Sequence, residues 1–513
     1  MILRPRSLSR VQWRSCRRLM TLAIETSCDD TSVAIVEKGV QQGQAVARLH
    51  FHKKVTSDNS AFQGIHPLVS LQAHQENLAD LVKEAIDHLP RNARGYANEQ
   101  DPASSVPVST RRLPDLISVT RGPGMRSNLC TGLDTAKGLA VAWQKPLIGV
   151  HHMQAHALTP RLVSALEAGS CPSDYTPPGE PAEDDIVSCS PNYPFLSVLA
   201  SGGHTLLIHS ASLADHQVLG STNDIAIGEY LDKVARVILP REILGTTKST
   251  MYGSLLEDFA FGETWQEDAR VQAQLAQGKS TPLQSSTLST PERTPPSDGD
   301  HASAETYYEM NRHRYRWYKV ATNHEDAMQR SATKWGWGFD QPLSRSSGGK
   351  KINSLEMSFS GLMTAAERVV RYGIDPVTKK LNKTERAASD ISLEERKDLA
   401  REAMRAAFEH VASRVVLGLL SLRDISTAQP AVVMAGGVAA NSFLRQILAS
   451  TLCFHGYPDV HLYFPPPKFC TDNAAMIAWT GLEMFEAGHT DPLSIRAIRK
   501  WPLDRLLDPP IDG

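Results

Sequence analysis

Two segments of the chain share one pattern, in which two apolar runs flank a short polar turn. Residues 21–36 read Thr-Leu-Ala-Ile-Glu-Thr-Ser-Cys-Asp-Asp-Thr-Ser-Val-Ala-Ile-Val, and residues 196–208 read Leu-Ser-Val-Leu-Ala-Ser-Gly-Gly-His-Thr-Leu-Leu-Ile. Each pattern predicts a strand, a turn and a second strand. Such a turn exposes backbone N–H groups that can bind a phosphate. One hairpin in each half favours a duplicated α/β architecture with a cleft between two lobes, although two unrelated hairpins would give the same pattern.

Two more apolar runs end in glycine-containing turns that lead into helices. Residues 115–126 predict a strand and a tight turn, followed by a helix through Leu133–Trp143. Residues 431–441 predict a buried strand, a Gly-Gly turn and the start of a helix. Glycines at such a turn let the backbone approach a ligand closely, but a lone Gly-Gly turn more often serves packing alone.

Three polar segments without periodicity interrupt these elements, at residues 90–113, 168–194 and 264–350. The last is rich in Ser, Thr, Pro and Gln, a composition that buries too little apolar surface to become ordered, so we expect a mobile surface loop. Near its end, basic and aromatic residues interleave at residues 312–319, Arg-His-Arg-Tyr-Arg-Trp-Tyr-Lys. Such residues can neutralise phosphates and stack on unpaired bases. An amphipathic helix packing its Tyr and Trp on the core is the interpretation that we favour.

The composition is that of a globular protein with more than one core. The chain has 513 residues, of which 41% are hydrophobic and 21% charged, and this length allows two or more core-forming units. No apolar stretch of about 18 residues occurs, so we expect no membrane span. The seven cysteines form no CxxC pair, which argues against a disulfide scaffold or a cysteine zinc finger. Because the net charge is −2, a nucleic acid would have to be held by local basic patches.

The first 24 residues contain six arginines, three serines and no acidic residue. An Arg- and Ser-rich start without acids is typical of a mitochondrial presequence. We therefore expect residues 1–20 to be a presequence and the protein to work in the mitochondrial matrix. A disordered basic tail is the alternative.

A candidate metal site follows the apolar run at residues 146–150. His152 and His156 are four residues apart, so on a helix they lie on one face and can bind one divalent metal ion. The residue after His152 is Met153 and not the glutamate of HExxH, so the adjacent base of a zinc peptidase is missing. By spacing alone, two histidines at a strand-to-helix turn remain the plainer interpretation.

Eight short motifs occur in order between residues 21 and 490. They are Ile24–Thr31, Thr120–Gly124, His151–His156, Ser201–Thr205, Gly228–Ala235, Ser358–Leu362, Gly436–Asn441 and Thr471–Ala475. In this combination the chain resembles the family of tRNA N6-adenosine threonylcarbamoyltransferases, and its Arg-rich start resembles the mitochondrial branch of that family.

The resemblance implies the two-lobed α/β fold of actin, Hsp70 and sugar kinases, with duplicated mixed-sheet domains around a central cleft. On this basis we expect lobe I at residues 21–150, completed by a C-terminal helix at 472–490. Lobe II would then span residues 151–471, with low-complexity insertions at 168–194 and 264–350.

The resemblance also implies a reaction. The threonylcarbamoyl group of threonylcarbamoyl-AMP moves to N6 of adenosine 37 in tRNAs that read codons beginning with adenine, and AMP leaves. The carbonyl must be polarised, and the charge that develops on the leaving phosphate must be stabilised. The family further implies a homodimer without a membrane anchor, and a separate synthase that supplies the donor.

Family roles carry over to particular residues of this chain. His152, His156 and Asp472 match the ligands of one divalent metal ion, and such a mixed set does not distinguish Zn, Fe and Mg. Asp29 is expected near the phosphates, where it would position the donor or help to deprotonate the amine. A helix N-cap is the alternative role of Asp472, and both roles can hold together.

The substrate-binding positions implied by the resemblance are Ala200, Ser201, Gly202, Gly203, His204, Asp232, Gly253 and Asn441. The first five match the donor-phosphate loop, Asp232 matches a ribose-binding carboxylate, and the last two match nucleoside contacts. A surface ion pair with Lys233 is the alternative for Asp232, and an ordinary helix cap is the alternative for Asn441.

Some positions depart from the family pattern, and other functions remain open. Gln154 stands where many relatives have Glu, Met363 where Lys is common, and the loop before Gly253 lacks the usual Pro-Gly-Gly. An ATP-dependent sugar kinase or ATPase of the same fold would not explain the histidine pair with Asp472. A metallopeptidase would lack its glutamate, and a non-catalytic tRNA-binding scaffold is the third alternative.

Overall fold

The computed structural model describes residues 18–62, 64–91, 111–170, 188–245, 251–262, 301–331, 333–344, 351–375, 377–378, 380–423 and 431–510. The predicted presequence lies almost entirely outside the described residues. So do residues 263–300 of the predicted loop and most of the segments 90–113 and 168–194.

The first sheet has the strand order β3-β2-β1-β4-β5. Its strands are β1 (Leu19–Glu25), β2 (Asp30–Gln41), β3 (Gln44–Thr56), β4 (Leu116–Gly122) and β5 (Leu147–His151). The first three form an antiparallel meander, and β1, β4 and β5 run parallel to one another. Because parallel strands end at the same edge of a sheet, the residues that follow β1, β4 and β5 meet there.

The second sheet repeats this plan in the order β8-β7-β6-β10-β11-β9. Its strands are β6 (Phe195–Ala200), β7 (Thr205–Ser210), β8 (His216–Ser221), β9 (His301–Ser303), β10 (Ala431–Ala435) and β11 (His461–Tyr463). Again the first three form an antiparallel meander, and β6, β10 and β11 are parallel. The equal strand order confirms the duplicated α/β architecture, and β9 adds one antiparallel edge strand.

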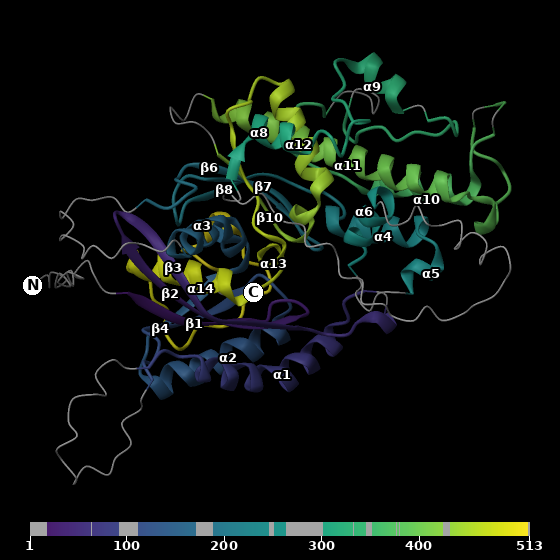
Figure 1. The fold of residues 1–513 in the computed structure, drawn as a ribbon. Helices are drawn as coiled ribbons and strands as arrows, with labels where there is room; N and C mark the ends of the chain where they lie inside the picture. The colour runs from purple at the N-terminus through teal and green to yellow at the C-terminus, as the bar shows by residue number, and fades with distance from the viewer. Residues whose placement is uncertain are drawn as a thin grey trace, which may run out of the picture.

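Helices and sheets alternate in layers, which Figure 1 shows from the bottom upward. Helices α1 (Pro67–Asp87) and α2 (Arg126–Trp143) cover the outer face of the first sheet, and α3 (His152–Ser170) and α14 (Ala474–Glu486) lie between the sheets. α14 is apolar on nearly all sides, as a helix between two sheets must be, and its Trp479 is completely buried.

The long helix α11 (Leu393–Leu422) covers the outer face of the second sheet and packs against further helices. The remaining helices of this lobe are α4 (Ile227–Ile238), α5 (Arg241–Leu244), α6 (Gly253–Phe261), α8 (Ala304–Asn311), α9 (His324–Ser331), α10 (Ser360–Tyr372), α12 (Ser442–Phe454) and α13 (Pro467–Cys470). Since α14 packs on β1, β2 and β4, the C-terminal part of the chain returns to the first sheet. The exact domain boundaries stay predictions.

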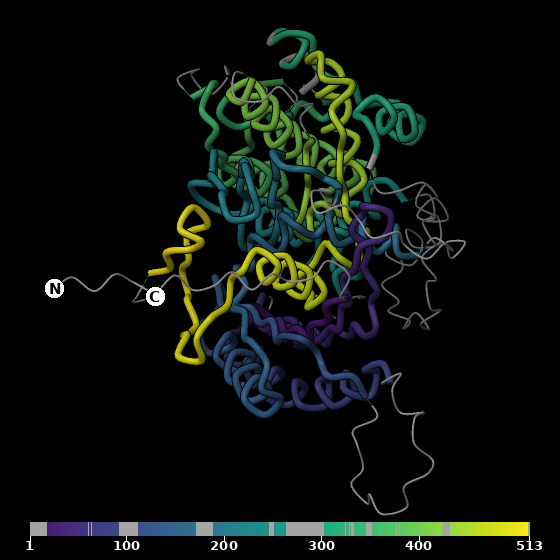
Figure 2. Tube along the Cα trace, turned by 90° about the vertical axis from the view of Figure 1, so that its left-hand side faces the viewer, coloured from purple at the N-terminus to yellow at the C-terminus, as the bar shows by residue number. Residues whose placement is uncertain are grey.

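After α14 the chain runs along one side of both sheets, as the yellow segment in Figure 2 shows. Asp491 N–H donates to the Leu147 carbonyl at 2.9 Å, and Ile498 N–H donates to the Arg121 carbonyl at 2.8 Å. The short helix η7 (Leu503–Arg505) then packs on β8. The C-terminal segment therefore ties the two sheets together.

The expectation of a loop without regular structure over residues 264–350 is wrong for residues 301–344. This part contains β9, α8 and α9, and its Tyr307, Tyr315 and Trp337 are buried. These aromatic side chains supply the apolar surface that the Ser- and Pro-rich part lacks. Residues 312–317 form turns and not the favoured amphipathic helix.

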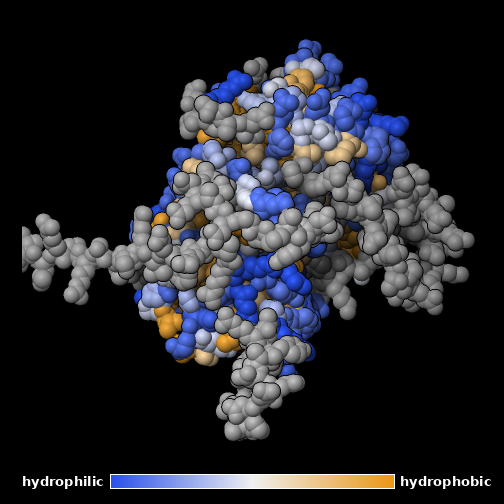
Figure 3. Space-filling view, turned by 60° about the vertical axis from the view of Figure 1, so that its left-hand side comes forward, coloured by the Kyte–Doolittle hydropathy of each residue, from blue (hydrophilic) through white to orange (hydrophobic). Residues whose placement is uncertain are grey.

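The described residues include no helix with enough apolar length to cross a bilayer. On the face drawn in Figure 3, hydrophilic side chains dominate and apolar ones form small separate patches. Isolated apolar side chains of this kind are ordinary on the surface of a globular protein.

Candidate metal centre and nucleotide-binding turn

The histidine pair lies where β5 passes directly into α3. His152 and His156 occupy the first and fifth positions of the helix, and their ring centroids are 4.7 Å apart. Both side chains are buried, with 7% and 2% of the residue surface exposed. The helical spacing expected from the sequence is therefore present, and both rings face the interior between the two sheets.

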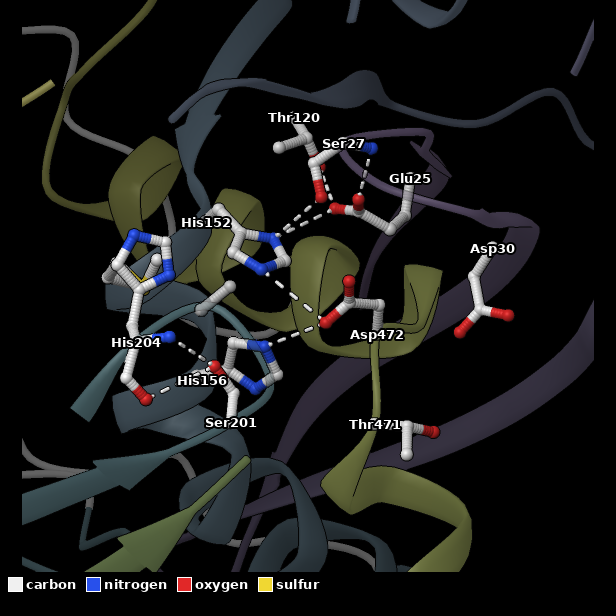
Figure 4. Close-up of polar contacts among 12 residues, drawn as sticks. Glu25, Ser27, Asp30, Thr120, His152, His156, Ser201, His204, Thr471 and Asp472 are labelled. Atoms are coloured by element: carbon white, nitrogen blue, oxygen red, sulfur yellow. Dashed lines mark hydrogen bonds and ion pairs between the residues drawn. The ribbon is translucent and has the colours of Figure 1, made fainter. Parts of the chain in front are cut away.

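Asp472 brings a carboxylate to the same place from the segment between α13 and α14. Its Oδ1 lies 3.1 Å from His156 Nε2 and 3.4 Å from His152 Nε2 (Figure 4). The three candidate ligand atoms all lie within 4.8 Å of one another. Two imidazole nitrogens and one carboxylate oxygen form a donor set that suits a divalent transition metal and leaves coordination positions open.

The charges of this centre attract a cation strongly. Burial alone would lower the pKa of His152, but the carboxylates of Asp472 and Glu25 outweigh it and raise that pKa to about 10. Burial would likewise raise the pKa of Asp472, yet His152 holds it well below its usual range. The two carboxylates thus stabilise positive charge at His152, and a bound divalent cation would supply that charge instead.

Glu25, the last residue of β1, is a part of the centre to which the sequence analysis gave no role. It is completely buried, its Oε1 accepts the Ser27 N–H at 2.6 Å, and its Oε2 accepts the Thr120 hydroxyl. The same Oε2 lies 3.4 Å from His152 Nδ1. A carboxylate on the far nitrogen of a metal-binding histidine fixes the tautomer and the ring orientation. In the sequence, the only sign of this role was that an acidic residue directly follows an apolar run that predicts a strand.

Replacing Glu25 by Gln is expected to raise the dissociation constant for a divalent metal about 10- to 100-fold, because the amide removes the charge that orients His152. Titration with Co²⁺, followed by its absorption spectrum, measures this without any enzymatic assay. Glu37→Gln is the matched control, since Glu37 makes a comparable buried contact with His50 at 3.0 Å in the same sheet. Equal affinities for wild type and Glu25→Gln would contradict this role of Glu25.

His151 fixes the start of the metal-binding helix. Its Nδ1 accepts the N–H groups of Met153 and Gln154 at 3.2 and 3.4 Å, so it serves as an N-cap. Nδ1 is therefore the acceptor, and Nε2–H donates to the Trp501 carbonyl at 2.9 Å. Through this contact the C-terminal segment holds the first turn of α3, which carries His152 and His156.

The β6–β7 turn (residues 200–204) lies next to the N-terminus of α4. Gly228 N–H donates to the Ser201 carbonyl at 3.1 Å, and a Cβ on Gly228 would meet that oxygen at 2.6 Å. A Cβ on Gly202 or Gly203 would meet no atom within 4 Å. The turn therefore borders open space and is backed by a helix N-terminus, the arrangement that binds phosphates in many proteins.

His204 connects this turn to the histidine pair. Partial removal from water, together with the positive charge of His152, lowers the pKa of His204 to about 4. Ser201 Oγ accepts the His204 N–H at 3.1 Å and closes the turn. Figure 4 places His204 and Ser201 beside His152 and His156. The structure thus brings the predicted phosphate loop and the predicted metal ligands into one site.

Asp232 anchors the start of α6. Its Oδ1 accepts the N–H groups of Tyr252 and Gly253 at 2.7 and 3.1 Å, and burial raises its pKa to about 6. The alternative ion pair with Lys233 is absent from the described residues, because Lys233 pairs with Glu229 at 2.6 Å. Asp232 and Gly253 therefore lie together, as two contacts to one nucleoside would require.

Asn441 is the N-cap of α12. Its Oδ1 accepts the Phe443 and Leu444 N–H groups at 3.0 and 3.1 Å. The helix-cap interpretation is thus correct, and a nucleoside would have to contact the same side chain in addition.

Asp29 lies in the β1–β2 turn, where burial and the nearby charge of Asp472 raise its pKa. The neighbouring Lys54, a residue that the sequence analysis missed, donates to Asp30 Oδ2 at 2.9 Å and to Thr471 Oγ1 at 2.8 Å. This link holds the first hairpin against the segment that carries Asp472. A single lysine within a strand gave no signal in the sequence.

Fold and site together define an α/β protein with duplicated sheets, a candidate metal centre and a glycine-containing turn beside a helix N-terminus. A model of the family described as tRNA N6-adenosine threonylcarbamoyltransferase matches residues 108–172, 184–266 and 296–479. The mitochondrial tRNA N6-adenosine threonylcarbamoyltransferase of Schizosaccharomyces pombe is 32% identical over 96% of this chain and 89% of that protein. The tRNA N6-adenosine threonylcarbamoyltransferase of Methylocapsa acidiphila is 27% identical over 95% of this chain and 97% of that protein.

The chain therefore belongs to the family of tRNA N6-adenosine threonylcarbamoyltransferases. Its two mixed sheets with alternating helix layers are the actin-like, ATPase-type fold of this family. The resemblance stated from the eight motifs is thereby confirmed.

Proposed function

We propose that the protein transfers the threonylcarbamoyl group from threonylcarbamoyl-AMP to N6 of adenosine 37 in mitochondrial tRNAs that read codons beginning with adenine. The observation that carries this proposal is the position of the β6–β7 turn beside His152, His156 and Asp472. Transfer from a mixed anhydride needs both a phosphate site and a group that polarises the carbonyl. A matrix location, a homodimer and a separate donor synthase belong to the same proposal and rest on the family alone.

One divalent metal ion would be held by His152, His156 and Asp472, with Glu25 orienting the first of these residues. When bound, such an ion supplies a Lewis acid that withdraws charge from oxygens of the donor. The chemistry of the donor set fits this assignment, because the two imidazoles are neutral ligands and the one carboxylate would neutralise only one of the two charges of a divalent ion.

The donor phosphate is assigned to the β6–β7 turn. Backbone N–H groups at Gly202 and Gly203, together with the N-terminus of α4, would stabilise the negative charge that grows on AMP as it leaves. Asp232 has a second carboxylate oxygen, Oδ2, that can accept a ribose hydroxyl while Oδ1 holds the start of α6.

In the transfer step the acceptor N6 attacks the carbamoyl carbon, and the bond from that carbon to the phosphate oxygen breaks. N6 gains the carbamoyl group and loses one proton. Asp29 is the proposed acceptor of that proton, because its raised pKa makes it a stronger base than an ordinary aspartate. AMP carries away the electron pair of the broken bond.

The alternative functions explain less of the site. A sugar kinase or ATPase would use the β6–β7 turn and Asp232 but would leave the buried histidine pair without a purpose. A metallopeptidase of the HExxH type needs a glutamate directly after the first histidine, and this chain has Met153 there. Neither alternative agrees with the family to which the chain belongs.

Incubation of the purified protein with threonylcarbamoyl-AMP and an ANN-decoding tRNA tests the proposal. Mass spectrometry of the digested tRNA should detect threonylcarbamoyladenosine. His156→Ala should give none, and His455→Ala, at the far end of α12, should match wild type. Stoichiometric phosphorylation of a sugar from ATP, or equal product from a metal-stripped double variant His152→Ala/Asp472→Ala, would refute the assigned chemistry.

Donor binding is expected to weaken in acid. Because Oδ1 of Asp232 accepts two backbone N–H groups, a proton would bind Oδ2, and a protonated carboxyl is a weaker acceptor for a ribose hydroxyl than a carboxylate. The pKa of about 6 therefore means that this hydrogen bond weakens as the pH falls through 6. The dissociation constant for a non-reactive donor analogue should therefore rise about tenfold from pH 7.5 to pH 5. Asp232→Asn keeps a carbonyl for the N–H groups of Tyr252 and Gly253 and should flatten this profile. An unchanged profile in this variant would show that another group, such as Asp30, titrates.

A further inference from the structure

Residues 312–319 carry a concentrated positive charge in a chain whose net charge is −2. Arg312, Arg314, Arg316 and Lys319 are exposed, and no acidic residue interrupts them. Arg312 forms an exposed pair with Glu309 at 3.1 Å, and exposed pairs of this kind contribute little free energy. Among the described residues, Arg314 and Arg316 enter no ion pair with a carboxylate.

Two tyrosines hold this segment rigidly on the start of α12. Tyr315 and Tyr318 have 1% and 8% of their surface exposed, and their rings lie 5.1 and 5.7 Å from the ring of Phe443. The hydroxyl of Tyr315 lies 2.7 Å from Ser442 Oγ, to which Arg314 Nη1 donates at 3.2 Å. Arg316 lies between the two buried tyrosines, and Arg314 and Lys319 flank them, and all three of these basic residues are exposed.

Trp317 presents an aromatic surface among these cations. It is 44% exposed, although most large apolar side chains of this lobe are buried. The centroid of its ring lies 5.3 Å from that of Phe443 and 6.2 Å from that of Phe261, on which the ring is stacked. The exposed part of the ring is therefore held in place, as a platform for a stacked base requires.

The segment is connected to the nucleoside contacts of the proposed function. Ser442, which Arg314 and Tyr315 contact, directly follows Asn441, and its N–H donates to Glu257 Oε1 in α6 at 3.0 Å. The first residue of α6 is Gly253, which Asp232 holds. The segment is therefore linked by contacts to Asn441 and, through α6, to Gly253, which are two of the proposed nucleoside contacts.

We propose that Arg312, Arg314, Arg316, Trp317 and Lys319 form an RNA-docking surface, which binds the unpaired anticodon loop of the tRNA. The proposal rests on the proposed function, in which the reacting adenosine lies beside the anticodon. Single-stranded loops are recognised by arginines on phosphates and by aromatic rings that stack on splayed bases. With no overall positive charge, the protein needs such a local patch to hold RNA.

Binding of an ANN-decoding tRNA at several salt concentrations tests the docking surface. The exposed double variant Arg314→Gln/Arg316→Gln should weaken binding roughly tenfold at 0.15 M salt and lower the salt slope by about 1 to 2 units. Trp317→Leu keeps an apolar contact with Phe443 but lacks the ring face, and should weaken binding about tenfold with an unchanged slope.

Two matched controls define the expected specificity. Lys83→Gln/Lys137→Gln removes two cations from α1 and α2, on the outer side of the other lobe, and Phe454→Leu removes a 46% exposed ring from the far end of α12. Both should bind tRNA like wild type. All variants should keep the wild-type melting temperature within a few degrees.

Failure of this proposal and failure of the proposed function give different results. If wild type forms threonylcarbamoyladenosine while the Arg and Trp variants bind tRNA with unchanged affinity and salt slope, the docking surface is wrong and the function stands. The docking surface would also be wrong if the Arg and Trp variants lost donor affinity but bound tRNA normally, which would indicate a nucleotide contact. A changed oligomeric state of these variants would indicate a protein contact instead. If wild type binds tRNA through this surface but forms no product, the surface stands and the proposed function fails.

Discussion

Replacing Asp472 by Asn should remove metal binding and lower the rate of threonylcarbamoyl transfer by at least about 100- to 1000-fold. The amide keeps the shape of the side chain but loses the charge that both Nε2 atoms approach, at 3.1 Å for His156 and 3.4 Å for His152. Without that charge Glu25 still neighbours His152, but it contacts the far nitrogen Nδ1 and not the two Nε2 atoms. Metal content by mass spectrometry and single-turnover product formation measure both effects.

The control for Asp472→Asn is Asp508→Asn, because Asp508 is a highly exposed carboxylate in a surface pair with Arg505. That variant should retain metal and activity. If Asp472→Asn lost its metal but kept the wild-type rate, the histidines and the aspartate would form a structural centre, and the polarising role would have to be withdrawn.

The local part of the site could be predicted from the sequence because its signals are short-range. The helical period places His152 and His156 on one face of α3, and the polar turns between apolar runs predict both hairpins. Asp472 lies 316 residues after His156 and Glu25 lies 127 residues before His152. No spacing rule reaches across such distances, so only the family resemblance supplied Asp472, and the role of Glu25 was not predicted.

The strand topology explains why these distant residues meet. β1, β4 and β5 are parallel neighbours, so Glu25, Thr120 and His152 arrive at one edge although long segments separate them. For a related reason, the composition gave a wrong prediction of an irregular loop for residues 301–344. A Ser- and Pro-rich average over residues 264–350 hid the few aromatic residues, such as Tyr307 and Trp337, that find buried positions in the second lobe.

Gly228→Ala is expected to weaken binding of the donor at least tenfold and to destabilise the protein by about 1–3 kcal/mol. The added Cβ would meet Ser201 O at 2.6 Å and Gly202 N at 2.7 Å. Both are backbone atoms, so α4 and the β6–β7 turn must move apart and the hydrogen bond from Gly228 N–H to Ser201 O must lengthen. A donor phosphate would then lose the fixed distance between the turn and the N-terminus of α4, on which its binding depends.

The matched control for Gly228→Ala is Gly361→Ala. Each glycine is the second residue of its helix, α4 and α10, but a Cβ on Gly361 would meet no atom within 4 Å. The control should therefore melt at or slightly above the wild-type temperature and bind the donor normally, since alanine favours helix more than glycine does. Calorimetric titration with a non-reactive donor analogue separates the two effects. If the Gly228→Ala protein were destabilised but bound the donor with unchanged affinity, the assignment of the donor phosphate to this turn would be wrong. The metal centre would then stand without its neighbouring phosphate site, and the transfer chemistry would need a different geometry.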